Sequence, residues 1–196
     1  MIEWINVIIM TATCLLSFYF YIKSVGPAAL EKKIGKNAYK KCTQYRMLSG
    51  IFMTISFLCY VVYYFFPLPI PVPQTFPWDW RFSAVLAVIL AIPSGYILLR
   101  GVLDAGEESM IVKKEHTMYG GIYDKIRHPQ ALGELPFVWV ISLLLNSPFL
   151  FVFSFIWVPI YYYMCIAEEK DLEIRYGQKY LEYKKNTGFL IPKNTK

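Results

Sequence analysis

The chain has 196 residues, of which 56% are hydrophobic, and its formal net charge is +6. This length predicts a single domain, and the apolar fraction is high for a soluble domain but ordinary for a membrane protein. The positive charge does not predict nucleic-acid binding, because the basic residues flank apolar segments, where they fit anionic lipid head groups. The four cysteines have no zinc-like spacing, and they predict core packing and neither a metal site nor a disulfide framework.

The first apolar run extends from Ile5 to Ile22 and predicts a membrane helix. It is long enough to cross a hydrocarbon core of about 30 Å and too long for the apolar part of a signal peptide. A basic connection from Lys23 to Arg46 follows. In this connection Pro27 predicts the start of a short interfacial helix, and Gly35 predicts its interruption.

Two more apolar runs follow, Met47 to Phe66 and Phe82 to Leu99. Alternating prolines separate them, and prolines at this density favour an extended path, here along the membrane interface. The third run contains Pro93 and Gly95, where we expect a kink.

The second half of the chain begins with a polar stretch, Arg100 to Arg127. The runs Ala131 to Leu145 and Phe149 to Ile166 come next, joined by a turn so short that it predicts a helical hairpin. The first arm of this hairpin is short for a crossing, about 22 Å at 1.5 Å per residue. The polar tail, Ala167 to Lys196, has the composition of a helix.

These runs predict an all-α polytopic membrane protein with five transmembrane helices, the last two forming a hairpin. Basic loops stay cytoplasmic, and five crossings with the N-terminus outside and the C-terminus in the cytoplasm satisfy every loop. We expect one integral membrane domain, in which residues 1–99 form three membrane helices and residues 100–196 form the catalytic core. The polar stretch and the tail then meet on the cytoplasmic side, where they predict a cofactor-binding region.

The stretch from Lys113 to Leu135 concentrates the polar chemistry of an otherwise apolar chain. It contains both histidines, His116 and His128, and the adjacent glycines Gly120 and Gly121, which allow a ligand to approach the backbone closely. With no cysteine or third histidine nearby, the histidines predict hydrogen bonding and no metal site. Pro129 fits the first turn of a helix, whose free N–H groups suit a carboxylate or ribose oxygens, and Gly133 leaves room beside that helix.

Glu168 and Glu169 directly follow the last apolar run, at the end of a helix, where the helix dipole disfavours acids. Two interpretations are open. The pair is exposed at the interface and meets Lys170 or Arg175, or it faces a cationic partner in a binding site. Arg175 also lies one turn from Asp171, with which it can pair.

The segment Gly121 to Gly133 resembles the signature G-x-Y-x-x-x-R-H-P-x-x-x-G of the isoprenylcysteine carboxyl methyltransferase family. The segment Glu168 to Lys184 resembles the tail E-E-x(6)-[FY]-G-x-x-Y-x-x-Y-[KR] of the same family. Both halves are present in order, whereas the first three helices match only in kind. The small size suits a prokaryotic member.

This resemblance implies a multi-helical membrane fold and S-adenosylmethionine as cofactor. The implied reaction transfers a methyl group to the C-terminal carboxylate of a prenylated cysteine, or of a similar lipid-like acceptor that enters from the bilayer. Carried over by position, it implies the following cofactor-binding residues: Lys113, His116, Thr117, Met118, Tyr119, Gly121, Tyr123, His128, Pro129, Gln130, Ala131, Gly133 and Glu168.

A carboxylate is already ionised at neutral pH, so the implied reaction needs alignment and exclusion of water but no general base. Glu168 and the helix start at His128 are expected to hold the cofactor, and Arg127 or Arg175 to attract the substrate carboxylate. Animal members of the family carry an arginine four residues before the position of Glu168, and this chain has Met164 there. Another cation or another acceptor is therefore expected.

Three alternatives stay open. The same scaffold can methylate a phospholipid amine, whose proton must then be removed. A membrane reductase is the second alternative, because sterol reductases carry a similar R-H-P and glutamate tail but use NADPH. The third is a membrane scaffold with a vestigial pocket, for which Met164 is the best support.

Overall fold

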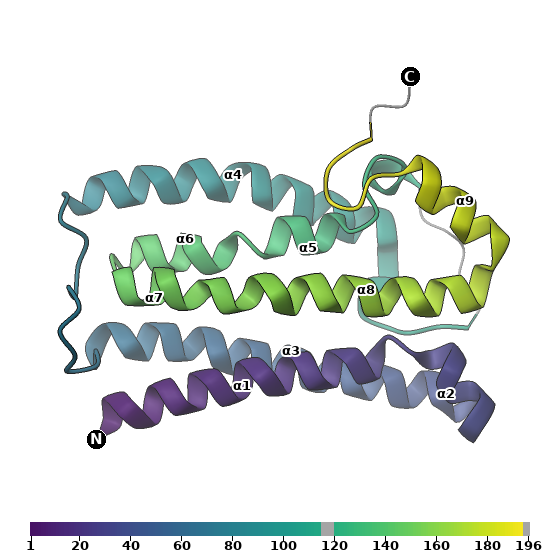
Figure 1. Ribbon diagram of the computed structural model, residues 1–196, viewed down its shortest axis with the longest axis horizontal. Coiled ribbons are helices and arrows are strands. Elements are labelled where there is room, and N and C mark those ends of the chain that lie inside the picture. Colours follow the sequence, from purple (N-terminus) through teal and green to yellow (C-terminus); the bar gives the residue numbers. More distant parts are fainter. Residues whose placement is uncertain (115–119, 194–196) are drawn as a thin grey trace.

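A computed structural model of the chain describes residues 1–114 and 120–193, and Figure 1 shows its arrangement. In the described residues all regular structure is helical apart from one isolated bridge between Ile126 and Gly188. Four helical stretches are long and apolar enough to cross a membrane, as judged from length and composition within the described chain: Ile2–Ser24, Asn37–Phe65, Trp80–Ala105 and Pro148–Tyr176. The chain is therefore an all-helical membrane protein.

The first half of the chain forms α1 (Ile2–Ser24), α2 (Pro27–Ile34), α3 (Asn37–Phe65) and α4 (Trp80–Ala105). The predicted short helix after Pro27 is confirmed as α2, and Gly35 ends it with φ at +67°. α3 begins well before the apolar run that predicts it. The extension carries Lys, Gln and Arg residues, which are good helix formers and can place their charges beyond the hydrocarbon.

α4 runs as one helix through Pro93 and Gly95. Membrane helices tolerate proline because neighbouring helices supply compensating contacts. The predicted kink at Pro93 stays a prediction. The proline-rich segment between α3 and α4 contains no helix, as expected.

The second half forms η1 (Gly106–Ser109), η2 (Gly121–Asp124), α5 (Pro129–Glu134), α6 (Phe137–Leu144), α7 (Pro148–Phe153), η3 (Ser154–Ile156), α8 (Trp157–Tyr176) and α9 (Gln178–Asn186). Residues 129–144 count as one apolar helix that is shorter than the four candidate spans. In Figure 1, α5 and α6 run between α4 and the line of α7 and α8, and α1 and α3 cover the opposite side of that line. The fifth crossing therefore depends on this short helix.

Figure 1 also shows that the basic segments gather at one end of the bundle. α2, α9 and the start of α5 lie at this end, whereas the N-terminus, the proline-rich connection and the turn before α7 lie at the other. The polar stretch and the polar tail thus meet in space.

Small and polar residues join the helices in the interior. Ser17 of α1 is hydrogen-bonded to Ser49 of α3, and Tyr60 of α3 is hydrogen-bonded to Ser154. Such pairs stabilise helix packing where lipid offers no alternative partner. All four cysteines are buried and free, which confirms the prediction that they pack in the core.

Gly133 lets α5 lie directly against α4. A Cβ atom at this position would be 2.7 Å from the Cα of Leu98, and the obstacle is backbone, which cannot turn aside. Gly101 of α4 faces Pro129 and Gln130 in the same contact. This close packing fixes the helix that carries Gln130 and Ala131.

We therefore expect Gly133→Ala to lower stability by about 1–3 kcal/mol, the usual cost of overpacking. The measurement is thermal unfolding in detergent micelles. Gly50→Ala is the matched control, because a Cβ at Gly50 meets nothing within 4 Å and alanine favours a helix. Equal melting temperatures for the two variants would contradict the close α4–α5 contact.

Candidate functional site

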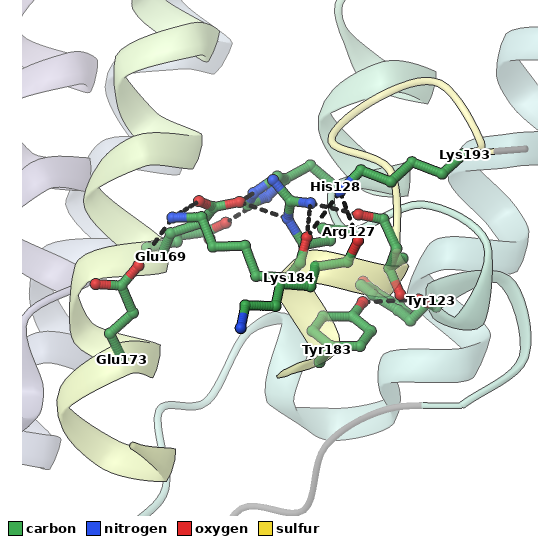
Figure 2. Close-up of polar contacts among 11 residues, drawn as sticks. Tyr123, Arg127, His128, Glu169, Glu173, Tyr183, Lys184 and Lys193 are labelled. Carbon is green, nitrogen blue, oxygen red and sulfur yellow. Dashed lines mark hydrogen bonds and ion pairs between the residues drawn. The ribbon is translucent and has the colours of Figure 1, made fainter. Parts of the chain in front are cut away.

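The tail after α9 folds back onto the segment that precedes α5. The N–H of Arg127 donates to the carbonyl of Gly188 at 2.8 Å, and the N–H of His128 donates to the carbonyl of Phe189 at 3.3 Å. The Phe189 ring packs edge-on against the His128 ring, with centroids 4.9 Å apart. This backbone pairing turns the side chains of Arg127 and His128 toward α8 (Figure 2).

His128 lies between the two adjacent acids of α8. Its Nδ1 is 3.3 Å from Oε2 of Glu168, and its Nε2 is 3.2 Å from Oε1 of Glu169. A neutral imidazole has one donor nitrogen and one acceptor nitrogen, so it cannot satisfy two carboxylates at once. The geometry therefore favours the doubly protonated, positively charged form.

The pKa of His128 agrees with this geometry. Burial lowers it, but hydrogen bonds to Cys165, Glu168 and Glu169 outweigh that effect, and the pKa is raised well above its ordinary value. His128 is then a cation at neutral pH.

Glu169 is the centre of a buried ionic cluster, shown in Figure 2. Arg127 donates from Nε to its Oε1 at 2.7 Å, and Lys184 of α9 contacts its Oε2 at 2.7 Å. The side chain of Glu169 is only 3% exposed and that of Arg127 only 8%. Lys184 also reaches Glu173 at 2.8 Å, and these two carboxylates raise the pKa of Lys184. One carboxylate thus holds α8, α9 and the start of α5 together.

Arg127 is anchored further by the chain around it. Its guanidinium donates to the carbonyls of Lys184 and Thr187, at 3.2 and 2.5 Å, and lies over the Phe189 ring. These contacts give Arg127 a structural task in holding the tail. Its predicted role toward the substrate stays a prediction.

Glu168 is joined to the first helix of the protein. The hydroxyl of Tyr21, near the end of α1, donates to Oε1 of Glu168 at 2.5 Å. His128 approaches the other oxygen of the same carboxylate. Glu168 therefore has a fixed orientation, set by residues far away in the sequence.

The predicted glycine turn has a definite cause in the structure. Gly121 has φ at +68°, and a Cβ there would collide with the carboxylate of Asp104. That carboxylate accepts a hydrogen bond of 2.8 Å from the N–H of Ile122. The turn places Tyr123, whose hydroxyl donates to the carbonyl of Gly101 and accepts from Gln130.

These elements surround a cavity of about 780 Å³. At one end it is lined by polar groups, among them Tyr123, His128, Gln130 and Glu168. Elsewhere the lining is mostly apolar and comes from α3, α4, α5 and α8. The cavity can hold a ligand with both polar and apolar parts.

The structure brings many of the predicted site residues together. Seven of them line the cavity: Tyr123, Arg127, His128, Gln130, Ala131, Glu168 and Arg175. Four others support it from outside the lining, namely Lys113, Gly121, Pro129 and Gly133. His116, Thr117, Met118 and Tyr119 lie outside the described residues. Each cofactor contact stays a prediction.

Arg175 has several partners at the edge of the cavity. It donates to the carbonyls of Lys113 and Lys114, at 2.6 and 3.5 Å, and its guanidinium is 3.9 Å from Asp171. Asp171 in turn accepts from the N–H of Ala28 at the start of α2. The predicted pairing of Arg175 with Asp171 is confirmed.

Four cavity residues were missed by the sequence analysis: Tyr21, Arg46, Glu134 and Tyr161. Tyr21 and Arg46 lie far from the motif and carried no signal of a contact with it. Glu134 did carry a signal, because it is an ionisable residue inside an apolar run, and such residues need a reason.

The model of the phospholipid methyltransferase family matches residues 82–179. This range contains α4 to α8, including Arg127, His128 and both acids of α8. No curated protein and no solved structure matches the chain.

The ionic cluster predicts very different costs for two neighbouring acids. We expect Glu169→Gln to lower stability by about 3–5 kcal/mol, because it leaves buried Arg127 without its carboxylate. Glu173→Gln is the matched control and should cost about 1 kcal/mol or less, since that acid is largely solvated and loses only Lys184. Thermal unfolding in one detergent measures both, and similar losses for the two variants would contradict the central place of Glu169.

His128 predicts a dependence of stability on pH. The raised pKa in the folded protein means that the protonated ring contributes stability, fully below about pH 6.5 and progressively less as the pH rises through the folded-state pKa. The melting-temperature advantage of the wild type over His128→Gln should therefore shrink between pH 6.5 and pH 9. An advantage that is constant or grows over this range would show that the ring is neutral in the folded protein.

Proposed function

The chain belongs to the phospholipid methyltransferase family and is a membrane methyltransferase, and from this premise we propose that it methylates the polar head of a lipid-like acceptor. The proposed donor is S-adenosylmethionine, which enzymes of this family typically use. Membership favours methyl transfer over the hydride transfer of a reductase and over a vestigial pocket.

One observation carries the proposal, namely that a single cavity joins the polar cluster to the outer surface of the helices. Its lining includes Met47 and Ile51 of α3 and Val102 of α4, which are 51%, 55% and 41% exposed. These apolar side chains face lipid in a membrane protein. A lipid tail can therefore lie between α3 and α4 while its head reaches the polar end.

The polar end suits the proposed cofactor. When bound, S-adenosylmethionine supplies a methyl group that its sulfonium already activates. The Glu168 carboxylate, the Gln130 amide and the Tyr123 hydroxyl provide acceptors and donors for a charged, hydroxylated ligand. The cavity volume is within the range of ordinary cofactor sites. We assign to this end the thirteen cofactor-binding positions that the sequence resemblance implies.

Two kinds of acceptor head fit this cavity. A prenylated cysteine presents a carboxylate, and Arg46 of α3 brings a guanidinium to the lining although Met164 stands where animal enzymes have arginine. Arg46 lies against the Tyr21 ring and donates to the carbonyl of Ser109 at 3.4 Å. It could equally meet the phosphate of a phospholipid.

A phospholipid amine is the second acceptor, and Glu134 favours it. This carboxylate lines the cavity and matches an ammonium group, whereas it would repel a carboxylate. An amine must also lose a proton before it can attack, which a carboxylate acceptor need not do.

The proposed topology has five crossings, with residues 129–144 as the fifth, the N-terminus outside and the C-terminus in the cytoplasm. It rests on the common end that the basic segments share in Figure 1. This orientation gives the cofactor access from the cytosol and the acceptor access from the bilayer.

We expect Glu168→Gln to weaken the binding of S-adenosylhomocysteine about 10- to 100-fold, which corresponds to the loss of a charge-assisted hydrogen bond. Isothermal titration of the purified protein measures this. Glu182→Gln, an exposed acid on α9, is the control and should bind as the wild type does. Unchanged affinity in Glu168→Gln would place the cofactor elsewhere.

The reaction itself is tested with radiolabelled S-adenosylmethionine and two acceptors, N-acetyl-farnesylcysteine and phosphatidylethanolamine. Label that base releases from the product indicates a methyl ester, and base-stable label in the lipid indicates an N-methyl group. No transfer together with no binding of S-adenosylhomocysteine would overturn the proposed function.

A further inference from the structure

Glu134 is an acid that the family resemblance does not explain. It ends α5, lies within the apolar stretch 129–144, and lines the cavity. Its hydrogen-bonding neighbour is Tyr161 of α8, whose hydroxyl also contacts the Met53 sulfur at 3.7 Å. An ionisable group at such a place is costly unless it has a function or a partner.

The other acids of the cavity lining have their partners in the protein. Glu168 is held by His128 and Tyr21, and Asp171 is held by Arg175 and the N–H of Ala28. Glu134, by contrast, forms no ion pair anywhere in residues 1–114 and 120–193. Its carboxylate is therefore available for a cation that enters the cavity.

Helix geometry places Glu134 deeper in the bundle than the cofactor end. It lies one turn beyond Gln130 on the same face of α5, about 6 Å along the helix. Its neighbour Tyr161 lies two turns before Glu168 on α8, roughly 10 Å along that helix. The carboxylate thus faces the part of the cavity between the polar end and the apolar walls of α3 and α4, where an acceptor head would meet the cofactor.

We propose that Glu134 binds the ammonium head of the acceptor and removes its proton, and that Tyr161 orients the carboxylate for this task. The inference rests on the proposed function. Glu134 takes one proton from the ammonium, and the nitrogen lone pair that is freed forms a bond to the methyl carbon. The carbon–sulfur bond breaks, its electron pair stays on sulfur, and S-adenosylhomocysteine leaves. The proton on Glu134 is then released to water, which returns the carboxylate.

The N-terminal half contributes the other side of this acceptor site. Arg46 of α3 reaches the same cavity from the basic end of the bundle. A phosphate near Arg46 and an ammonium near Glu134 would make complementary contacts with one phospholipid head. Neither residue belongs to the motifs that define the cofactor end.

The decisive experiment compares Glu134→Gln with the wild type in methyl transfer to phosphatidylethanolamine. We expect kcat/KM for the amine acceptor to fall by about 10²- to 10⁴-fold, the usual contribution of a positioned base. Glu134→Asp keeps a carboxylate and should retain more activity than Glu134→Gln. Glu182→Gln, with an exposed acid, should behave as the wild type.

A binding measurement that does not depend on turnover separates the possible causes. With S-adenosylhomocysteine bound, dodecylammonium micelles are titrated and the fluorescence of the protein is followed. Glu134→Gln should weaken dodecylammonium binding at least 10-fold while it leaves the affinity for S-adenosylhomocysteine within about threefold.

Each remaining outcome decides against a specific claim. Equal dodecylammonium binding by wild type and Glu134→Gln, or retained amine methylation in Glu134→Gln, overturns the role of Glu134. A loss of affinity for S-adenosylmethionine alone assigns the carboxylate to the sulfonium charge of the cofactor and also overturns it. Methyl esters formed equally by wild type and Glu134→Gln overturn the amine acceptor but keep the methyltransferase, whereas absence of S-adenosylhomocysteine binding overturns the proposed function itself.

Discussion

The buried carboxylate of Glu169 is the constraint on which the rest of the site depends. A charge that is 3% exposed needs compensation, and Arg127, His128 and Lys184 supply it from three different segments. Each of these contacts fixes a piece of the cavity wall. Arg127 holds the tail, Lys184 holds α9, and His128 carries the charge on to Glu168. Removing the carboxylate would release all three segments, which is why this structural acid stands directly beside the one that faces the cavity.

The pair Glu168 and Glu169 thus divides one position in the sequence between two tasks. Successive residues on a helix point about 100° apart, so one acid turns toward the ionic cluster while the next turns toward the cavity. His128 links them because both of its ring nitrogens face a carboxylate. Fold stability and ligand binding are therefore coupled through one histidine, and a change in its charge affects both.

Much of this organisation could be predicted from the sequence, and the parts that could not have a common physical reason. The apolar runs predicted the membrane helices, and the acids after the last run predicted a cationic partner, because such local patterns carry their own signal. The contact between Tyr21 and Glu168 spans most of the chain and arises only when α1 packs beside α8. The early start of α3 was missed for a different reason, since hydropathy marks where the lipid ends and not where the helix ends.

Glu134 shows how the two halves of the chain share the proposed work. The family match covers residues 82–179 and with them the cofactor end, whereas Arg46 and the lipid-facing wall of α3 lie outside it. A donor common to a family needs a constant binding surface, but acceptors differ and need a variable one. Helices at the edge of the bundle can change without disturbing the cluster around Glu169. Specificity for the acceptor would then reside where the N-terminal helices meet the end of α5, one turn away from the residues that hold the donor.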